Sequence, residues 1–265
     1  MAKFKHFLVA APYYLWIGLF VILPIGLIFI YSFHDLNGHF TLNNYLNFFK
    51  NSTYLLMAFN SLCFAIIITF ISLIVAYPIA WIISKFQNSR DFLILLVIMP
   101  MWINLLLKTY AFIGIFSRNG TLNNLLANLG LGRHQFLFTD IAFILVAVYD
   151  QLPFMILPIY NSVIAINHSL INASYDLGAS KTQTFWRIIV PLTLPGIKSG
   201  VQAIFIPSLS LFMITRLIGG NRVITLGTAI EEHFLSTMNW GMGSTIGVIL
   251  IIAMILIMLL TKESK

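Results

Sequence analysis

The sequence predicts an all-α membrane protein that crosses the bilayer six times. One observation is composition: of 265 residues, 59% are hydrophobic and 9% are charged, whereas ordinary globular proteins carry about 25% charged residues. The other is a series of apolar runs, each long enough to cross a hydrocarbon core of about 30 Å. The composition therefore excludes a soluble domain.

The six predicted spans lie near residues 8–33, 56–84, 92–116, 141–160, 197–217 and 244–261. The fifth is the least regular, because Pro207, Ser208 and Ser210 interrupt it. Such an interruption is tolerated in a membrane helix only where neighbouring helices or a polar cavity satisfy the backbone. No internal repeat divides the chain, so we expect one transmembrane domain over residues 1–265.

The distribution of basic residues predicts the orientation. Six spans place both termini on one side, and that side holds nine Lys and Arg residues against four in the opposite loops. The positive-inside rule then places both termini in the cytoplasm. The net charge of +7 is scattered between spans, so we expect a lipid bilayer and no nucleic acid as partner. In the outer loops, residues 40–49 and 226–240 mix apolar and polar side chains, which suggests short interfacial helices.

The connection after the fourth span, residues 161–198, is the longest cytoplasmic segment. A first helical piece has Asn167 or Ser169 available as its cap, and Gly178 stands where a chain reversal would end it. A second piece is predicted from Ser180 to Val190, before prolines end it. Both pieces are too short to span and too apolar for a plain connector. They either bind a partner's groove or pack on the protein's own cytoplasmic face.

The order of residues in this connection resembles the EAA loop of ABC-importer permeases. The matching positions are Ala173, Asp176, Leu177, Gly178, Ala179, Phe185, Pro191, Leu192, Pro195 and Gly196. Asn172 stands where that family usually has Glu, and Ser174 stands where it has Ala. The resemblance implies a MetI-like permease core whose loop couples it to a cytoplasmic ATPase, with Gly178 as the most firmly transferred position.

The resemblance extends over nearly the whole chain, through Leu107-Lys-Thr-Tyr-Ala-Phe, Leu152-Pro-Phe-Met-Ile-Leu-Pro-Ile-Tyr and Phe205-Ile-Pro. These segments look like the PotB-type subunit of the spermidine/putrescine branch. That implies polyamine uptake across the bacterial cytoplasmic membrane. It also implies three kinds of partner: a second, PotC-type permease, an ATPase dimer and an extracytoplasmic binding protein. The sequence lacks a Gly-x-x-x-x-Gly-Lys-Ser/Thr motif. We therefore expect ATP and Mg to be used by the ATPase, with no cofactor and no enzymatic activity here.

Two charged residues fall inside predicted spans, Asp150 in the fourth and Lys108 in the third. Each costs about 2.5–3.5 kcal/mol on insertion scales, so each is a functional hypothesis by default. Three interpretations stay open: the two side chains neutralise each other, Asp150 lines the pathway and attracts the ammonium groups of a polyamine, or they contact the second permease or water.

Further pathway candidates are Tyr149, beside Asp150, and Ser208 and Ser210 in the interrupted fifth span. Leu211 and Arg216 occupy positions where related permeases place acids, and the cation of Arg216 opposes simple attraction of a polycation. The six histidines show no metal-ligand spacing, and no nucleophile and base pair is evident. The alternatives are an ABC permease for another small solute, an ion-driven secondary transporter and a membrane scaffold.

Overall fold

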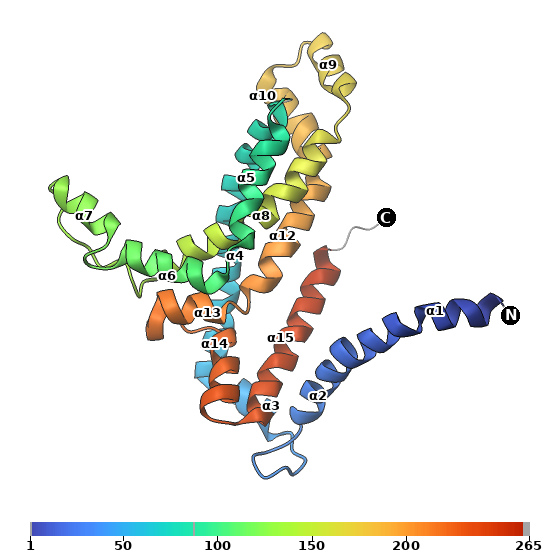
Figure 1. Ribbon diagram of the computed structural model, residues 1–265, viewed down its shortest axis with the longest axis vertical. Helices are drawn as coiled ribbons and strands as arrows, with labels where there is room; N and C mark the ends of the chain where they lie inside the picture. The colour runs from blue at the N-terminus through green and yellow to red at the C-terminus, as the bar shows by residue number, and fades with distance from the viewer. Residues whose placement is uncertain (1, 87, 262–265) are drawn as a thin grey trace. The chain divides into compact units, whose positions relative to one another are not determined.

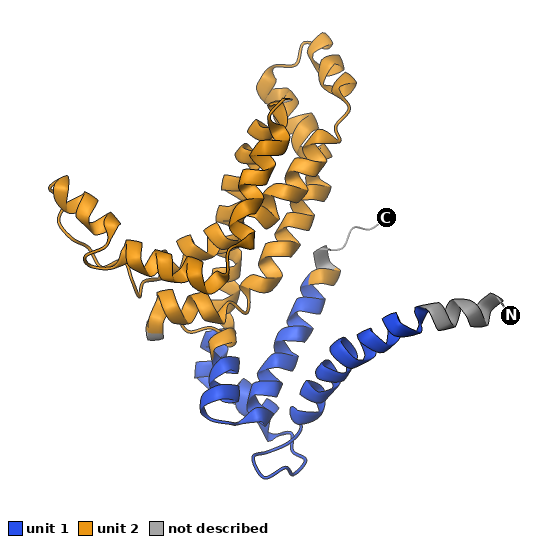
Figure 2. Ribbon diagram, in the orientation of Figure 1, with its two compact units in different colours: residues 1–57, 229–257 blue, residues 58–228, 258–265 orange. Residues whose placement is uncertain are grey.

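The computed structural model describes residues 2–86 and 88–261 (Figure 1). Those residues form helices and connections, with one isolated antiparallel bridge between His34 and Phe40. They cluster into two compact units, coloured separately in Figure 2. One unit holds the described residues up to Met57 together with Ala229–Ile257. The other holds Ala58–Thr228 with the segment that begins at Met258.

The first unit is built on two apolar helical segments. Its elements are α1 (Ala2–Ile17), η1 (Gly18–Ile22), α2 (Leu23–Tyr31), α3 (Asn43–Lys50), the start of α4 (Ser52–Lys85), the second half of α14 (Leu226–Glu231), η5 (Glu232–Ser236) and most of α15 (Trp240–Thr261). The segment from α1 to α2 is one continuous helix with a π-helical turn in its middle, because Ile17 and Ile22 both keep helical backbone angles. Thr245 donates to the carbonyl of Ser32 at 3.0 Å, which ties α15 to the end of α2.

The second unit contains the longest helices and the loops between them. Its elements are α4, α5 (Arg90–Trp102), α6 (Leu105–Phe116), α7 (Thr121–Asn128), α8 (Asp140–Ile164), α9 (His168–Asp176), α10 (Lys181–Thr184), η2 (Phe185–Ile189), α11 (Val190–Leu192), α12 (Leu194–Ser208), α13 (Phe212–Ile214), η3 (Thr215–Gly219) and η4 (Gly220–Arg222).

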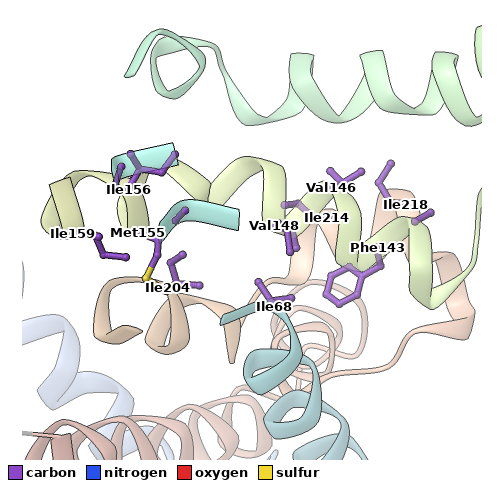
Figure 3. Packing of buried hydrophobic residues seen from close by; sticks show 14 of the residues in the cluster. Ile68, Phe143, Val146, Val148, Met155, Ile156, Ile159, Ile204, Ile214 and Ile218 are labelled. Carbon is purple, nitrogen blue, oxygen red and sulfur yellow. The ribbon is translucent and has the colours of Figure 1, made fainter. Parts of the chain in front are cut away.

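The core of the second unit lies where α8 packs against α12. Figure 3 shows Met155 and Ile159 of α8 beside Ile204 of α12, and all three are fully buried. Two glycines of α12 permit the close approach. A Cβ atom at Gly196 would meet the backbone oxygen of Pro158 at 2.4 Å, and one at Gly200 would meet the sulfur of Met155 at 2.5 Å. Small residues at such contacts let membrane helices gain van der Waals contact along their backbones.

The structure confirms four spans as uninterrupted helical segments and corrects two. Long apolar segments run over Ala10–Tyr31, Ser52–Lys85, Asp140–Ile164 and Trp240–Leu259. The described residues contain six spans only if each of two bent helix pairs counts as one.

The third predicted span, 92–116, is wrong as a continuous helix. It breaks between α5 and α6, and the helical segments on either side of the break meet at 91°. Asn104 has extended backbone and its side chain accepts the amide N–H of Leu106 at 2.8 Å, so it starts a new helix inside the apolar run. The third span is therefore interrupted as well as the fifth.

The fifth predicted span, 197–217, is wrong at its C-terminal end, because the helix ends earlier than predicted. Helix α12 stops at Ser208, and Leu211, with ψ of 76°, leaves helical backbone before α13 begins. The chain then continues as the π-helical turn η3 and the short η4. The predicted short helices outside the spans are present as α3 in residues 40–49 and as α14 and η5 in residues 226–240.

Candidate functional site: a capped helical hairpin and an intramembrane ion pair

The connection between α8 and α12 folds into a helical hairpin, which we call the 168–192 hairpin (α9, α10, η2 and α11). The side chain of Asn167 accepts the amide N–H of Ser169 at 3.0 Å and so caps α9, as predicted. Gly178 ends this helix with φ of +80°. The amide of Gly178 donates to the carbonyl of Tyr175, and that of Ala179 to the carbonyl of Ser174. These two bonds form a Schellman motif, which favours glycine at this position.

The second helix of the hairpin begins with a reciprocal cap. The Ser180 hydroxyl accepts the amide N–H of Gln183, and the Gln183 side chain accepts that of Ser180. The two helices are joined by a buried hydrogen bond of 2.9 Å between the hydroxyls of Ser174 and Thr184. Serine at 174, where the resembling family has alanine, thus has a structural partner in this chain.

The turn of the hairpin presents a mixed surface to its surroundings. Leu177 is 89% exposed, which is unusual for a large apolar side chain at a helix end. Asn172, Ala173 and Asp176 are exposed as well, while Ala179 is half-buried. An apolar tip flanked by polar side chains is the composition expected of a surface that another protein covers.

The base of the hairpin is fixed to the long helix α4. The ring of Phe185 lies edge-on to Tyr77, with centroids 5.6 Å apart, and to Trp81 at 6.0 Å. The Tyr77 hydroxyl also bonds to the hydroxyl of Thr193 at 2.9 Å. These contacts connect the hairpin to α4 by packing and by one polar link.

The hairpin passes into α12 through a bend of 61° at Thr193. Pro191 and Pro195 lie on either side of this residue, and both are exposed. The second helical piece therefore ends at Leu192, slightly later than the predicted Val190. Beyond the bend, Gly196 contacts α8 closely, so the hairpin continues directly into the helix that packs against α8.

Lys108 and Asp150 form an ion pair between α6 and α8. The ammonium of Lys108 contacts a carboxylate oxygen of Asp150, and their side chains are 9% and 18% exposed. Of the three open interpretations, the structure contains the contact that mutual neutralisation requires, because the two charged groups touch each other. An opposite charge at contact offsets part of the cost of placing each charge in an apolar span.

The other pathway candidates lie in different surroundings. Tyr149 is partly exposed, and its ring stands 5.0 Å from that of Phe112 on α6. Ser208 is buried; it donates to the carbonyl of Ile204 and accepts from the amide of Gln151 at 3.0 Å. Ser210 bonds to the carbonyl of Pro207. The structure therefore pairs some of these residues but does not gather them into one site.

Gln151 is a residue that the sequence analysis missed. It is 3% exposed, its amide nitrogen bonds Ser208 across the contact of α8 with α12, and its carbonyl oxygen has no hydrogen-bond partner among the described residues. The signal in the sequence that could have identified Gln151 is a side-chain amide within an apolar span, directly after Asp150.

Arg216 lies on η3 and is exposed, and η3 packs against α6 and α8. No three His, Cys, Asp or Glu side chains in the described part of the chain are grouped as a metal site.

Comparison with known proteins identifies the family. The family model for the inner membrane component of binding-protein-dependent transport systems matches residues 6–262. The chain belongs to this family. It is 36% identical over 264 residues to the spermidine/putrescine transport system permease protein PotB of Haemophilus influenzae. This alignment covers 96% of this chain and 92% of that protein. It is 37% identical to the PotB protein of Escherichia coli, which covers 92% of both chains.

Solved structures support the fold. A chain from a bacterial alginate ABC transporter crystallised with an alginate-bound periplasmic protein matches with a TM-score of 0.80. That match covers 98% of this chain and 93% of the other at 17% identity. An inward-facing MetNI methionine ABC transporter matches with a TM-score of 0.59, covering 78% and 92% at 16% identity. The chain is thus a multi-pass inner membrane permease subunit of an ABC importer, and the predicted MetI-like helical fold is confirmed.

Proposed function

We propose that this chain is a permease subunit of an ATP-driven importer of spermidine and putrescine. The observation that carries the proposal is the identity of 36% and 37% to two permeases named for spermidine/putrescine transport, over at least 92% of each chain. The subunit would assemble with a second, PotC-type permease, an ATPase dimer and an extracytoplasmic binding protein. The ATPase uses ATP and Mg, and this chain supplies the helices that move.

The segment 161–198 is proposed as the ATPase-coupling loop. Its support is geometric: the exposed tip at Leu177 offers an apolar contact, and the two caps hold both hairpin helices in a defined shape. Force applied to the tip passes through Phe185 to α4 and through Gly196 to α8. These are the contacts by which closure of the ATPase would rock the spans between inward-facing and outward-facing states.

A cargo pathway beside α8 is proposed from Asp150, Tyr149, Ser208 and Ser210. In this conformation Lys108 neutralises Asp150, so a cargo ammonium gains from the carboxylate only where it displaces the lysine. Tyr149 offers a ring face for cation–π attraction, and the serine hydroxyls offer oxygen acceptors. This arrangement holds the pathway near neutrality until cargo arrives.

The orientation is proposed from the basic residues. Nine Lys and Arg residues lie on the side of the termini and the hairpin, against four on the other side. Both termini then face the cytoplasm of a bacterial cell. The hairpin faces the ATPase in the same orientation, so the two arguments agree.

Uptake of labelled spermidine in cells that lack this gene tests the proposal. The complementing copies are wild type, Gly178→Asp and Asp150→Asn. We expect wild type to restore uptake, and excess unlabelled putrescine to suppress it. Gly178→Asp should abolish uptake, because it adds a negative charge at the carboxyl end of α9, next to Asp176.

Asp150→Asn should reduce uptake, because it leaves the ammonium of Lys108 without its counter-ion. If cells without another polyamine importer still took up polyamines normally after deletion of this gene, the proposal that the permease imports spermidine and putrescine would be wrong. Normal uptake by the Gly178→Asp copy would overturn the coupling loop.

A further inference from the structure

An apolar pocket of about 370 Å³ lies at the base of the 168–192 hairpin, within the second unit. Helix α4 forms one wall, and the hairpin with the start of α12 forms the other. Leu73, Ile74, Tyr77, Phe185, Trp186 and Val190 contribute to its lining, and we call it the Ile74–Trp186 pocket. It is open at the protein surface, because Ile74 is 55% exposed and Trp186 is 63% exposed.

The pocket lies within reach of the headgroup layer of the bilayer. Helix α4 passes the pocket at Leu73–Pro78 and ends in a basic residue, Lys85. The helix rises about 10 Å between Pro78 and Lys85, whereas one leaflet contributes about 15 Å to the hydrocarbon core. An acyl chain whose headgroup lies near Lys85 therefore reaches the pocket within its own leaflet. Because bilayer and pocket are equally apolar, any selection among lipids must come from the headgroup.

Two aromatic rings connect the pocket to a cation. Phe185, which lines the pocket, lies edge-on to Trp81 with ring centroids 6.0 Å apart. The ammonium of Lys85 lies 4.3 Å from the centroid of the Trp81 ring. A cation over an aromatic face is held there by electrostatic attraction. Lys85 is therefore held on the face of α4 that contacts the hairpin.

A second cation belongs to the wall that the hairpin forms. Arg187 follows Trp186 in η2 and is exposed. Neither Lys85 nor Arg187 forms an ion pair within the described residues. Residues 52–85 and 177–230, which include every element that lines the pocket, contain no Asp or Glu. The charge of the two cations is therefore available to an anion from outside these elements.

We infer that the Ile74–Trp186 pocket binds an anionic phospholipid of the cytoplasmic leaflet, with an acyl chain in the pocket and the phosphate near Lys85 and Arg187. The inference rests on the proposed cytoplasmic position of the hairpin. Basic side chains at the cytoplasmic boundary attract anionic headgroups, and the guanidinium fork matches a phosphate group. A polyamine is repelled by the same charges, so the pocket does not hold cargo.

The bound lipid lies against the contact that fixes the hairpin to α4. Tyr77 and Phe185, whose rings are 5.6 Å apart, both line the pocket. An acyl chain there packs on both rings at once, while its headgroup bridges a cation of α4 and a cation of the hairpin. The lipid is therefore a third component of the connection between the hairpin and α4.

The test is quenching of Trp186 fluorescence by phospholipids with dibrominated acyl chains, in the complete importer in nanodiscs. Brominated phosphatidylglycerol or brominated phosphatidylcholine is titrated into unlabelled phosphatidylcholine, and the signal of Trp186 is the difference between wild type and Trp186→Phe. We expect half-maximal quenching at a mole fraction at least tenfold lower for the phosphatidylglycerol, because each cation strengthens binding about fivefold.

The charge variants are Lys85→Gln and Arg187→Gln, each compared with its own copy carrying Trp186→Phe. Each should reduce the preference for phosphatidylglycerol about fivefold. Arg90→Gln is the matched control, because Arg90 is exposed at the start of α5 and does not line the pocket. It should leave the preference within twofold of wild type.

Three results would overturn the lipid site. Equal quenching by the two brominated lipids in wild type would mean that the pocket takes bulk lipid. No quenching of Trp186 by either lipid would mean that another protein covers the pocket. An equal loss of preference in Arg90→Gln would mean that general surface charge suffices.

Failure of the proposed function and failure of the lipid site are distinguishable, because quenching requires no transport. Polyamine uptake by an importer without the lipid preference would remove the site and leave the function. The lipid preference in an importer that takes up no polyamine would do the reverse.

Discussion

Replacing Gly178 with alanine isolates the backbone geometry at the tip of the 168–192 hairpin. The φ angle of this residue is +80°. A Cβ atom added there meets no atom within 4 Å, so alanine introduces no collision inside the chain. The entire effect of the substitution therefore comes from the conformational preference of a residue that carries a Cβ atom.

The free-energy cost of this conformation for a residue with a Cβ atom is known. The left-handed conformation costs a residue with a Cβ atom about 1–2 kcal/mol relative to glycine. The cost falls on the Schellman motif that ends α9, and it lowers the ratio of capped to uncapped hairpin by a factor of about 5–30. If only the capped form binds the ATPase, the apparent Kd rises by up to the same factor. Asparagine visits this conformation more readily, so Gly178→Asn should weaken binding less than Gly178→Ala.

The assay is binding of the purified ATPase to the permease pair in nanodiscs, measured for wild type, Gly178→Ala and Gly178→Asn. We expect affinities in the order wild type, asparagine, alanine. Equal affinities for all three proteins would refute the argument from φ. Equal losses for both variants would also contradict it, because the size of the side chain in the partner's groove, and not the backbone, would then set the affinity.

Three further predictions concern buried contacts. Ser174→Ala removes the partner of the Thr184 hydroxyl and should lower the stability of the hairpin by about 1–3 kcal/mol. The rate of protease cleavage within the hairpin measures this loss, and the added substitution Thr184→Val should recover most of the lost stability. Lys108→Met leaves the carboxylate of Asp150 buried without its cation, a loss on the order of 3 kcal/mol. Thermal unfolding should show that loss, and the Asp150→Asn double variant should restore stability; no restoration would contradict the pairing. Burial lowers the pKa of His233 below its usual 6.5, although Glu232 opposes the shift. The unfolded state therefore binds a proton more readily, and this end of the first unit should lose stability as pH falls through about 6.5. Hydrogen exchange should detect this loss of stability at low pH. If the His233→Gln variant still lost stability over the same pH range, His233 would not be its cause.

Local chemistry explains what the sequence predicted well. The cap at Asn167 and the turn at Gly178 depend on hydrogen bonds between residues close in the chain, and such bonds leave recognisable patterns. The break in the third span left a comparable signal in Asn104, a capping residue inside an apolar run. A periodicity search over long windows overlooks it, because the run remains apolar on both sides of the break.

Contacts between distant segments explain what the sequence left open. The Lys108 and Asp150 pair joins residues 42 positions apart, and only the rotation of α6 and α8 about their axes brings them together. Gln151 meets Ser208 because Gly196 and Gly200 let α12 approach α8 closely. A single sequence shows that both charges and the amide are present, but helix packing decides which of them pair.

We propose that this permease moves polyamines when a separate ATPase turns over. The direct measurement is accumulation of labelled spermidine in vesicles that contain both permeases and the ATPase, with the binding protein added outside. We expect uptake that requires ATP, Mg and the binding protein and that excess unlabelled putrescine suppresses. ATP hydrolysis stimulated by the binding protein, with no accumulation of spermidine or putrescine, would contradict it.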